Sequence, residues 1–159
     1  MEHQERQKVT LEELVLLSIR VEMKADPESI GKAMGEAFGK VWGAREVANV
    51  EPSGPPMAAY VSMEDGIATA DVGIPISTED GAKFANDDVV TPVTLPSCEG
   101  IRTLHKGSYT KLGETYQATF AYIATTGAAP GWPIRETYLN DPEETPEAEW
   151  LTQIDFPLG

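Results

Sequence analysis

An acidic residue stands on the apolar side of a short predicted strand near the end of the chain. In the stretch PIRETYLNDPEETP, a period of two places Ile134, Glu136 and Tyr138 on one side of the strand. A carboxylate among such neighbours can attract a cation, or it can act as a general acid or base when burial raises its pKa. It can also form a buried ion pair, for which Arg20 and Arg102 on other predicted strands are the candidates.

Other chemistry finds little support in the sequence. The two histidines, His3 and His105, have no second His or Cys at the spacing of metal ligands, so we expect no metal site and a structural role for His105. Cys98 has no obvious histidine partner and is expected to be an unreactive thiol. Phosphate-binding loops and nucleophile elbows are absent from the sequence, so we expect no bound cofactor.

Composition narrows the classes of partner. The 159 residues are 41% hydrophobic, enough for one domain with its own core, and 12 Lys and Arg face 26 Asp and Glu for a net charge of −14. This charge would repel nucleic acid and anionic membranes, so we expect neither direct nucleic-acid binding nor membrane binding. With one cysteine and neither a secretory signal nor an apolar run long enough to span a bilayer, we expect a cytoplasmic, soluble protein.

An internal repeat indicates which elements hold the candidate residues. The tripeptide VTL occurs at residues 9–11 and 93–95, and each copy opens a similar series of elements. Each series continues with a β-rich stretch and a capped helix start, at Asp26 in the first half and at Ser108 in the second. Each helix carries an apolar stripe on one face. The stripes are Ile30, Met34, Phe38 and Val41, and Leu112, Tyr116, Phe120 and Ile123.

The end of each repeat predicts two further strands. Counting back from the strand tyrosines, Tyr60 matches Tyr138 and Ala58 matches Glu136, so the fold itself does not require a carboxylate at this position. The sequence therefore predicts an α+β fold of duplicated β-α-β-β units with pseudo-two-fold symmetry, in which two main helices pack on a curved, mainly antiparallel sheet. We expect one domain over residues 1–159. Its halves cover about 9–76 and 92–158, joined by a polar connector at about 77–91.

One local signal opposes this assignment. Thr10 to Glu13 forms an acceptable helix capping box, and the following apolar residues also have helical spacing. The stretch is nevertheless rich in β-branched residues, and its counterpart in the second half contains Pro96 and Gly100, which suit a helix poorly. We therefore predict a strand there.

The chain resembles the GyrI-like small-molecule-binding domain, the effector-binding domain of bacterial multidrug-sensing transcription activators, and the resemblance is most specific in the second half. The resemblance rests on HKGSYTKLGETYQATFAYIATTG followed by GWPIRETYLNDPEETPEAEW, and it extends from about Val9 to Pro157. It implies a curved sheet whose concave face and rim hold an aromatic-lined pocket. In that family the glutamate of the Arg-Glu-x-Tyr motif faces cationic, lipophilic drugs, and it maps onto Glu136.

A set of candidate site residues follows from the motif and from the predicted faces. The candidate ligand-binding residues are Glu136, Tyr138, Trp132, Tyr109, Tyr116, Phe120, Tyr60 and Met57. If the protein is an enzyme, Glu136 and Tyr138 are the candidate catalytic residues, because some members of the resembled family hydrolyse cyclopropane-bearing alkylators. Trp42 and Trp150 are expected to pack instead.

Three functions are compatible with these residues. The first is a stand-alone binding protein that captures lipophilic compounds, cationic ones included. The second is a hydrolase that detoxifies reactive small molecules. The third is a regulator that binds a protein partner such as DNA gyrase, as the resemblance to a gyrase-protecting protein implies. No helix-turn-helix precedes Val9, so we do not expect direct control of transcription.

Overall fold

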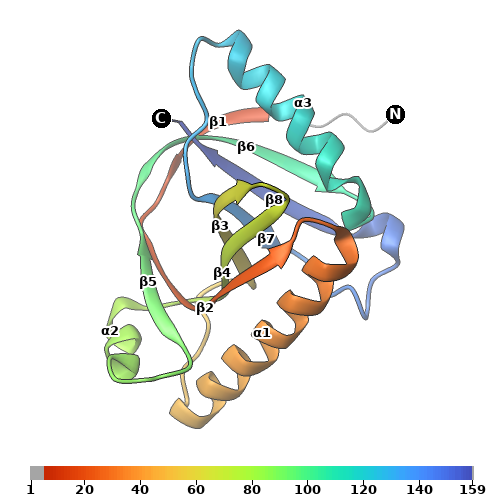
Figure 1. Cartoon of the computed structure of the whole chain (residues 1–159). Coiled ribbons are helices and arrows are strands. Elements are labelled where there is room, and N and C mark those ends of the chain that lie inside the picture. Colours follow the sequence, from red (N-terminus) through yellow and green to blue (C-terminus); the bar gives the residue numbers. More distant parts are fainter. Residues whose placement is uncertain (1–5, 159) are drawn as a thin grey trace.

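A single eight-stranded antiparallel sheet organises the computed structural model, which describes residues 6–158 (Figure 1). Its strand order is β1-β6-β8-β7-β3-β4-β2-β5. The strands are β1 (Arg6–Leu11), β2 (Leu14–Lys24), β3 (Met57–Glu64), β4 (Ile67–Ile76), β5 (Thr91–Leu95), β6 (Cys98–Lys106), β7 (Ile134–Tyr138) and β8 (Leu151–Pro157). The helices are α1 (Pro27–Ala48), α2 (Thr78–Gly81) and α3 (Leu112–Thr125), with 3₁₀ turns η1 (Ala82–Phe84), η2 (Tyr109–Lys111) and η3 (Glu147–Glu149). The predicted α+β class is confirmed.

The strand order shows the predicted duplication. β7 and β3 meet at the middle of the sheet, and the strands on either side follow in matching order from the two halves. The matching residues Ala58 and Glu136 are direct register partners, so the pseudo-two-fold axis passes between them. The first predicted strand of each half is divided in two, into β1 and β2 and into β5 and β6. Apart from residues 12–13, which separate β1 from β2, the stretch with the helix-like capping box is strand, as predicted.

The two halves exchange their first strands. β1 pairs with β6 of the second half, and β5 pairs with β2 of the first half, with the same register on both sides of a short break. The break leaves residues 12–13 and 96–97 outside the ladder. Arg135 on β7 lies beside it and donates to the carbonyl oxygens of Glu12 (2.9 Å) and Pro96 (2.7 Å). This one buried side chain thus forms hydrogen bonds with the backbone at the break in both halves.

Both predicted helices form where their caps indicate. The carboxylate of Asp26 accepts a hydrogen bond from the backbone N–H of Ser29 (2.8 Å), and Pro27 occupies the first turn of α1. The Ser108 hydroxyl caps η2, which leads directly into α3. The predicted connector, residues 77–91, contains α2 and η1, and its Phe84 is buried in the core.

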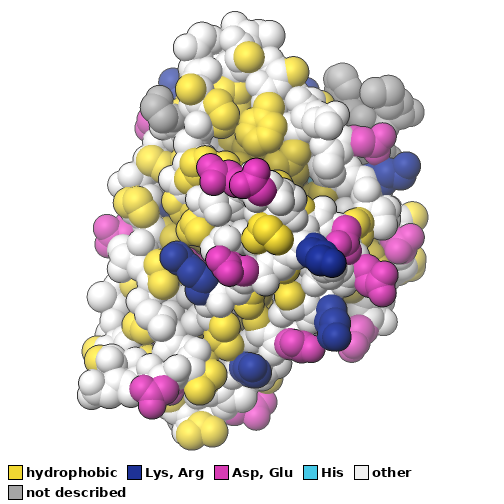
Figure 2. All heavy atoms as spheres, viewed as in Figure 1, with side chains coloured by type: hydrophobic (Ala, Val, Ile, Leu, Met, Phe, Trp, Pro, Cys, Tyr) yellow, Lys and Arg dark blue, Asp and Glu magenta, His cyan; other side chains and the backbone are white. Residues whose placement is uncertain are grey.

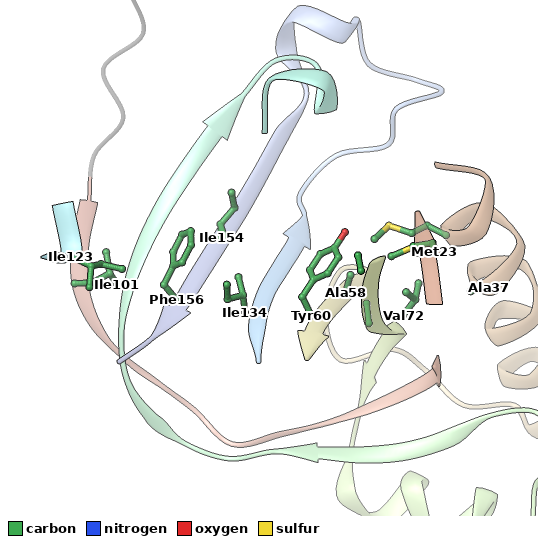
Figure 3. Packing of buried hydrophobic residues seen from close by; sticks show 13 residues of the cluster. Met23, Ala37, Ala58, Tyr60, Val72, Ile101, Ile123, Ile134, Ile154 and Phe156 are labelled. Atoms are coloured by element: carbon green, nitrogen blue, oxygen red, sulfur yellow. The ribbon is translucent and has the colours of Figure 1, made fainter. Parts of the chain in front are cut away.

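The two long helices cover the same face of the sheet. Met34 and Ala37 of α1 and Ile123 of α3 share one core cluster with inward-facing strand residues. Figure 3 shows how Phe156, Ile154, Ile134 and Tyr60 follow one another across neighbouring strands within that cluster. The apolar stripes predicted for the two helices therefore face the sheet. The side chains around Glu136 lie between these helices and the sheet.

The surface carries mixed charge along α1. On the face shown in Figure 2, Lys and Arg side chains lie among acidic ones over this helix, with apolar side chains visible beside α3. None of the helices in residues 6–158 is long and apolar enough to cross a membrane.

Two glycine substitutions are predicted to have opposite effects on stability. A Cβ at Gly73 on β4 would lie 1.8 Å from the Leu17 carbonyl oxygen, whereas a Cβ at Gly39 on the exposed side of α1 would meet nothing within 4 Å. We expect Gly73→Ala to lower the free energy of unfolding by about 3 kcal/mol or more. Gly39→Ala should raise it by about 1 kcal/mol, because alanine has the higher helix propensity. Urea unfolding followed by circular dichroism measures both, and equal midpoints for Gly73→Ala and the unmodified protein would contradict the close approach of β4 to β2.

Candidate functional site

Glu136 occupies the middle of the sheet on the face that the two long helices cover. It is 3% exposed, and Ala58 lies directly opposite it on β3. The period of two predicted from the sequence holds, because Ile134 and Tyr138 belong to the core cluster on this face. A methyl group rather than a second carboxylate therefore faces Glu136 across the pseudo-two-fold axis.

Two tyrosines bind the Glu136 carboxylate. The Tyr138 hydroxyl donates to Oε1 (2.7 Å), and the Tyr116 hydroxyl from α3 donates to Oε2. The Tyr138 hydroxyl also lies 3.5 Å from the sulfur of Met34 on α1. Residues from α1, α3 and β7 thus meet at one carboxylate.

Burial changes the titration of this cluster. It raises the pKa of Glu136, and the two tyrosine hydrogen bonds offset part of that rise. Burial, and after it the charge of Glu136, raises the pKa of Tyr116 and of Tyr138 well above the ordinary tyrosine value. The same two causes raise the pKa of Tyr60. The phenols therefore keep their protons at neutral pH and remain donors, while the carboxylate is less acidic than a surface glutamate.

The ion-pair alternative for Glu136 is not realised. Arg20 binds Asp71 through two hydrogen bonds of 2.9 Å, and Arg102 binds Asp155 at 2.8 Å. These two pairs occupy matching places in the two halves, between β2 and β4 and between β6 and β8. Neither arginine pairs with Glu136, because each has an acidic partner on the neighbouring strand.

Aromatic rings surround the carboxylate from both helices. The ring of Tyr138 contacts Phe38 edge-on at 6.1 Å between centroids and Tyr109 at 5.9 Å. On the other side, Tyr116 contacts Phe120 (6.1 Å) and Phe156 (5.3 Å). Of the candidate residues, the structure thus brings Glu136, Tyr138, Tyr116, Tyr109 and Phe120 together. Tyr60 joins them, because it shares a core cluster with Tyr116 and Tyr138 and lies close enough for the charge of Glu136 to raise its pKa.

Three further rings belong to the same cluster and were not among the predicted site residues. Phe38 lies on the apolar stripe of α1, so its spacing from Met34 was the available signal. Trp150 stacks on Tyr109 at 4.8 Å and donates from Nε1 to the Thr145 carbonyl oxygen, which confirms its predicted packing role. Phe156 is buried beneath α3; only the register of β8 with β7 brings it near the site.

Two other candidates lie apart from this cluster. Met57 faces the opposite side of the sheet, where it packs with Leu16, Ala59 and Leu95. The prediction that Met57 lines the same site as Tyr60 is wrong. The two residues are three positions apart on β3, so their side chains point to opposite faces of the sheet. Trp132, in the turn before β7, is 50% exposed, and its ring contacts no other ring among the described residues.

Trp42 does not pack as predicted. It is 44% exposed, and the Arg45 guanidinium lies 4.3 Å from its ring centroid. The buried residues of α1 include Val41, and the next position along a helix points about 100° away from it.

Polar side chains line the part of the sheet beneath α3. His105 is buried between the Ser108 carbonyl oxygen, to which Nε2–H donates (2.9 Å), and the Thr115 hydroxyl, 2.7 Å from Nδ1. Because the carbonyl can only accept, Nε2 carries the proton. His105 therefore has the structural role predicted for it. Within residues 6–158, no group of three or more His, Cys, Asp or Glu side chains is placed to hold a metal ion.

A groove of about 240 Å³ lies elsewhere, between β2 and α1. Its apolar lining comes from Ile19, Val21, Ala33 and Ala37, and its charged lining from Glu22, Glu36 and Lys40. The groove does not include Glu136. Space beside the Glu136 carboxylate is filled by aromatic side chains, so a ligand could reach it only after some of them move.

Comparisons with known proteins identify the fold. The family model of the GyrI-like small molecule binding domain matches residues 4–158. EcmrR in its DNA complex superposes with a TM-score of 0.79 at 16% identity, covering 98% of this chain and 57% of the EcmrR chain. The chain thus spans little more than half of that relative, whereas it covers 98% of the isolated EcmrR C-terminal domain, with a TM-score of 0.73 at 18% identity.

Two further solved structures share the fold. SAV2435 bound to tetraphenylphosphonium has a TM-score of 0.66 at 15% identity, with 98% of this chain and 94% of that chain covered. A hydrolase from Listeria innocua has a TM-score of 0.58 at 16% identity, with 97% and 91% covered. No curated protein has a significant match to the sequence. Because the family model spans nearly the whole chain, the chain belongs to the family of GyrI-like small-molecule-binding domains.

Proposed function

We propose that the protein captures lipophilic small molecules, cationic ones included, at Glu136 between α1 and α3. The observation that carries this proposal is a buried carboxylate whose two hydrogen-bond donors, Tyr116 and Tyr138, are neutral phenols. Burying a charged carboxylate is costly without a countercharge. A ligand cation would supply the countercharge that the Glu136 carboxylate lacks in the free protein, and this attraction would favour binding.

The rings around Glu136 favour an aromatic or delocalised cation. Phe38, Tyr109, Tyr116 and Tyr138 present faces and edges to the same small region. Cation–π attraction is worth about 0.5–2 kcal/mol per well-placed ring, and the apolar parts of the ligand would gain from leaving water. The relative SAV2435 is described as bound to tetraphenylphosphonium, a lipophilic cation, which supports this ligand class.

A second candidate function is hydrolysis of a reactive small molecule. The specific observation is that a carboxylate of raised pKa lies in direct hydrogen-bond contact with tyrosine hydroxyls. In its protonated form Glu136 could donate a proton to a departing group, and in its ionised form it could activate water. A Listeria innocua relative of the same fold is described as a hydrolase, which supports keeping this alternative.

A thermal-shift panel of lipophilic cations and cyclopropane-bearing alkylators, followed by mass spectrometry of the recovered compounds, separates the two functions. We expect tetraphenylphosphonium to raise the melting temperature and to be recovered unchanged. A water-added product from an alkylator, formed by the unmodified protein and not by Glu136→Gln, would establish hydrolysis instead. If no compound shifts the melting temperature and none is converted, both functions are rejected.

A further inference from the structure

Two buried threonine hydroxyls lie unused beside the Glu136 site. Thr103 on β6 and Thr152 on β8 are fully buried, and neither Oγ1 atom has a hydrogen-bond partner among the described residues. Thr152 is the register partner of Tyr138, and Thr103 is the register partner of Ile154, which in turn pairs with Glu136. Both hydroxyls therefore share a face with Glu136, one and two strands away from it.

The fold does not need these hydroxyls. A buried hydroxyl without a partner destabilises the folded state, and such groups are rare in native proteins. Other polar groups beneath α3 are engaged: both ring nitrogens of His105 have partners, and the Thr119 hydroxyl donates to the Thr115 carbonyl oxygen (2.8 Å). Nε of Arg6, the register partner of Thr103, is a further buried donor without a partner among the described residues. Valine has nearly the same shape as threonine and would remove the cost at Thr103 and Thr152. Retaining hydroxyls at a cost to stability indicates a partner outside the chain.

We propose that Thr152 and Thr103 form a hydrogen-bonding subsite that receives an uncharged polar group of the ligand, a hydroxyl or a carbonyl, next to the cationic group at Glu136. This inference rests on the proposed binding function and specifies its ligand class. Neighbouring strands lie about 4.8 Å apart, so the polar group belongs about 5–10 Å from the Glu136 carboxylate. The ligand is then a lipophilic cation with a hydrogen-bonding group a few bonds from its charge.

Two probes that differ in one group test the subsite. (3-Hydroxypropyl)triphenylphosphonium and butyltriphenylphosphonium have the same charge and nearly the same size, but only the first carries a hydroxyl. We expect the unmodified protein to bind the hydroxyl probe about fivefold more tightly, as one hydrogen bond predicts. Thr152→Val should abolish this preference and, without ligand, raise the melting temperature by about 2 °C. Thr103→Val should likewise weaken the preference for the hydroxyl probe and raise the melting temperature of the free protein.

Thr119→Val is the matched control, because it removes a hydroxyl from the same region whose hydrogen bond lies within α3. It should keep the preference for the hydroxyl probe. The subsite is rejected if the unmodified protein binds both probes equally. It is also rejected if Thr152→Val lowers the melting temperature and keeps the preference, since the hydroxyls would then serve the fold through a buried water. Failure of the proposed function looks different: Glu136→Gln would bind both probes as well as the unmodified protein, or neither probe would bind at all.

Discussion

Replacing Arg135 with leucine is expected to lower the free energy of unfolding by about 3–5 kcal/mol. Arg135 is 3% exposed, and its guanidinium donates to the carbonyl oxygens of Glu12 and Pro96, which lie where the ladder between the exchanged strands is broken. Proline has no N–H, so the backbone cannot repair the break at Pro96 by itself. Leucine would leave both carbonyls without this donor, and each such loss costs about 1–3 kcal/mol.

Chemical unfolding of three variants separates the hydrogen bonds from the charge. Arg135→Lys keeps a positive charge but has no planar fork to reach both carbonyls, so we expect an intermediate loss. Arg45→Leu is the control, because Arg45 donates to a single carbonyl, that of Val50 (2.7 Å), at the end of α1. It should cost about 1 kcal/mol. A loss of under about 1 kcal/mol for Arg135→Leu would contradict the role of Arg135 at the break.

Replacing Glu136 with glutamine is expected to stabilise the free protein at neutral pH and to weaken binding of lipophilic cations at least tenfold. Burial raises the pKa of Glu136, so the folded state holds a proton more tightly than the unfolded state does. Stability is therefore lost as pH rises from the ordinary glutamate value, about 4.3, towards the raised pKa, and it stays low above that. Glutamine does not titrate in this range. The Glu136→Gln variant should therefore have the higher free energy of unfolding at pH 7, and this difference should vanish below about pH 4.

Urea unfolding across this pH range and calorimetric titration with tetraphenylphosphonium measure the two effects. Glu114→Gln is the matched control: it removes a negative charge from the first turn of α3 on a side chain that is 76% exposed. It should leave binding unchanged and show no comparable gain at pH 7. If Glu136→Gln binds the cation as tightly as the unmodified protein, Glu136 is not the anchor of the site.

Short-range patterns in the sequence were sufficient for the two long helices and for the face of β7. Asp26 and Pro27 mark the start of α1 because capping depends on neighbouring residues alone. The alternation along β7 correctly placed Glu136 with Tyr138, and the stripe of α3 correctly placed Tyr116 towards the sheet. The same alternation also contained the signal that Met57 and Tyr60 face opposite sides of β3.

Contacts across the sheet were beyond such patterns. Thr152 and Thr103 neighbour the Glu136 row only through the registers of β8 with β7 and of β6 with β8. Arg135 reaches Glu12 across 123 positions of sequence, because β1 and β5 are exchanged between the halves. Registers and strand exchange are set by packing of the whole chain, so one sequence gave no local sign of either.

The place of Ala58 and Glu136 on the pseudo-two-fold axis bears on how such a site can arise. If two identical half-length chains formed this sheet as a symmetric dimer, the axis would put the same residue on both central strands. Two glutamates would then face each other with their Cβ atoms about 5 Å apart and repel, and two alanines would provide no charge at all. Joining the halves in one chain frees the two positions to differ. One strand can then hold the acid while the other contributes only a methyl group beside it.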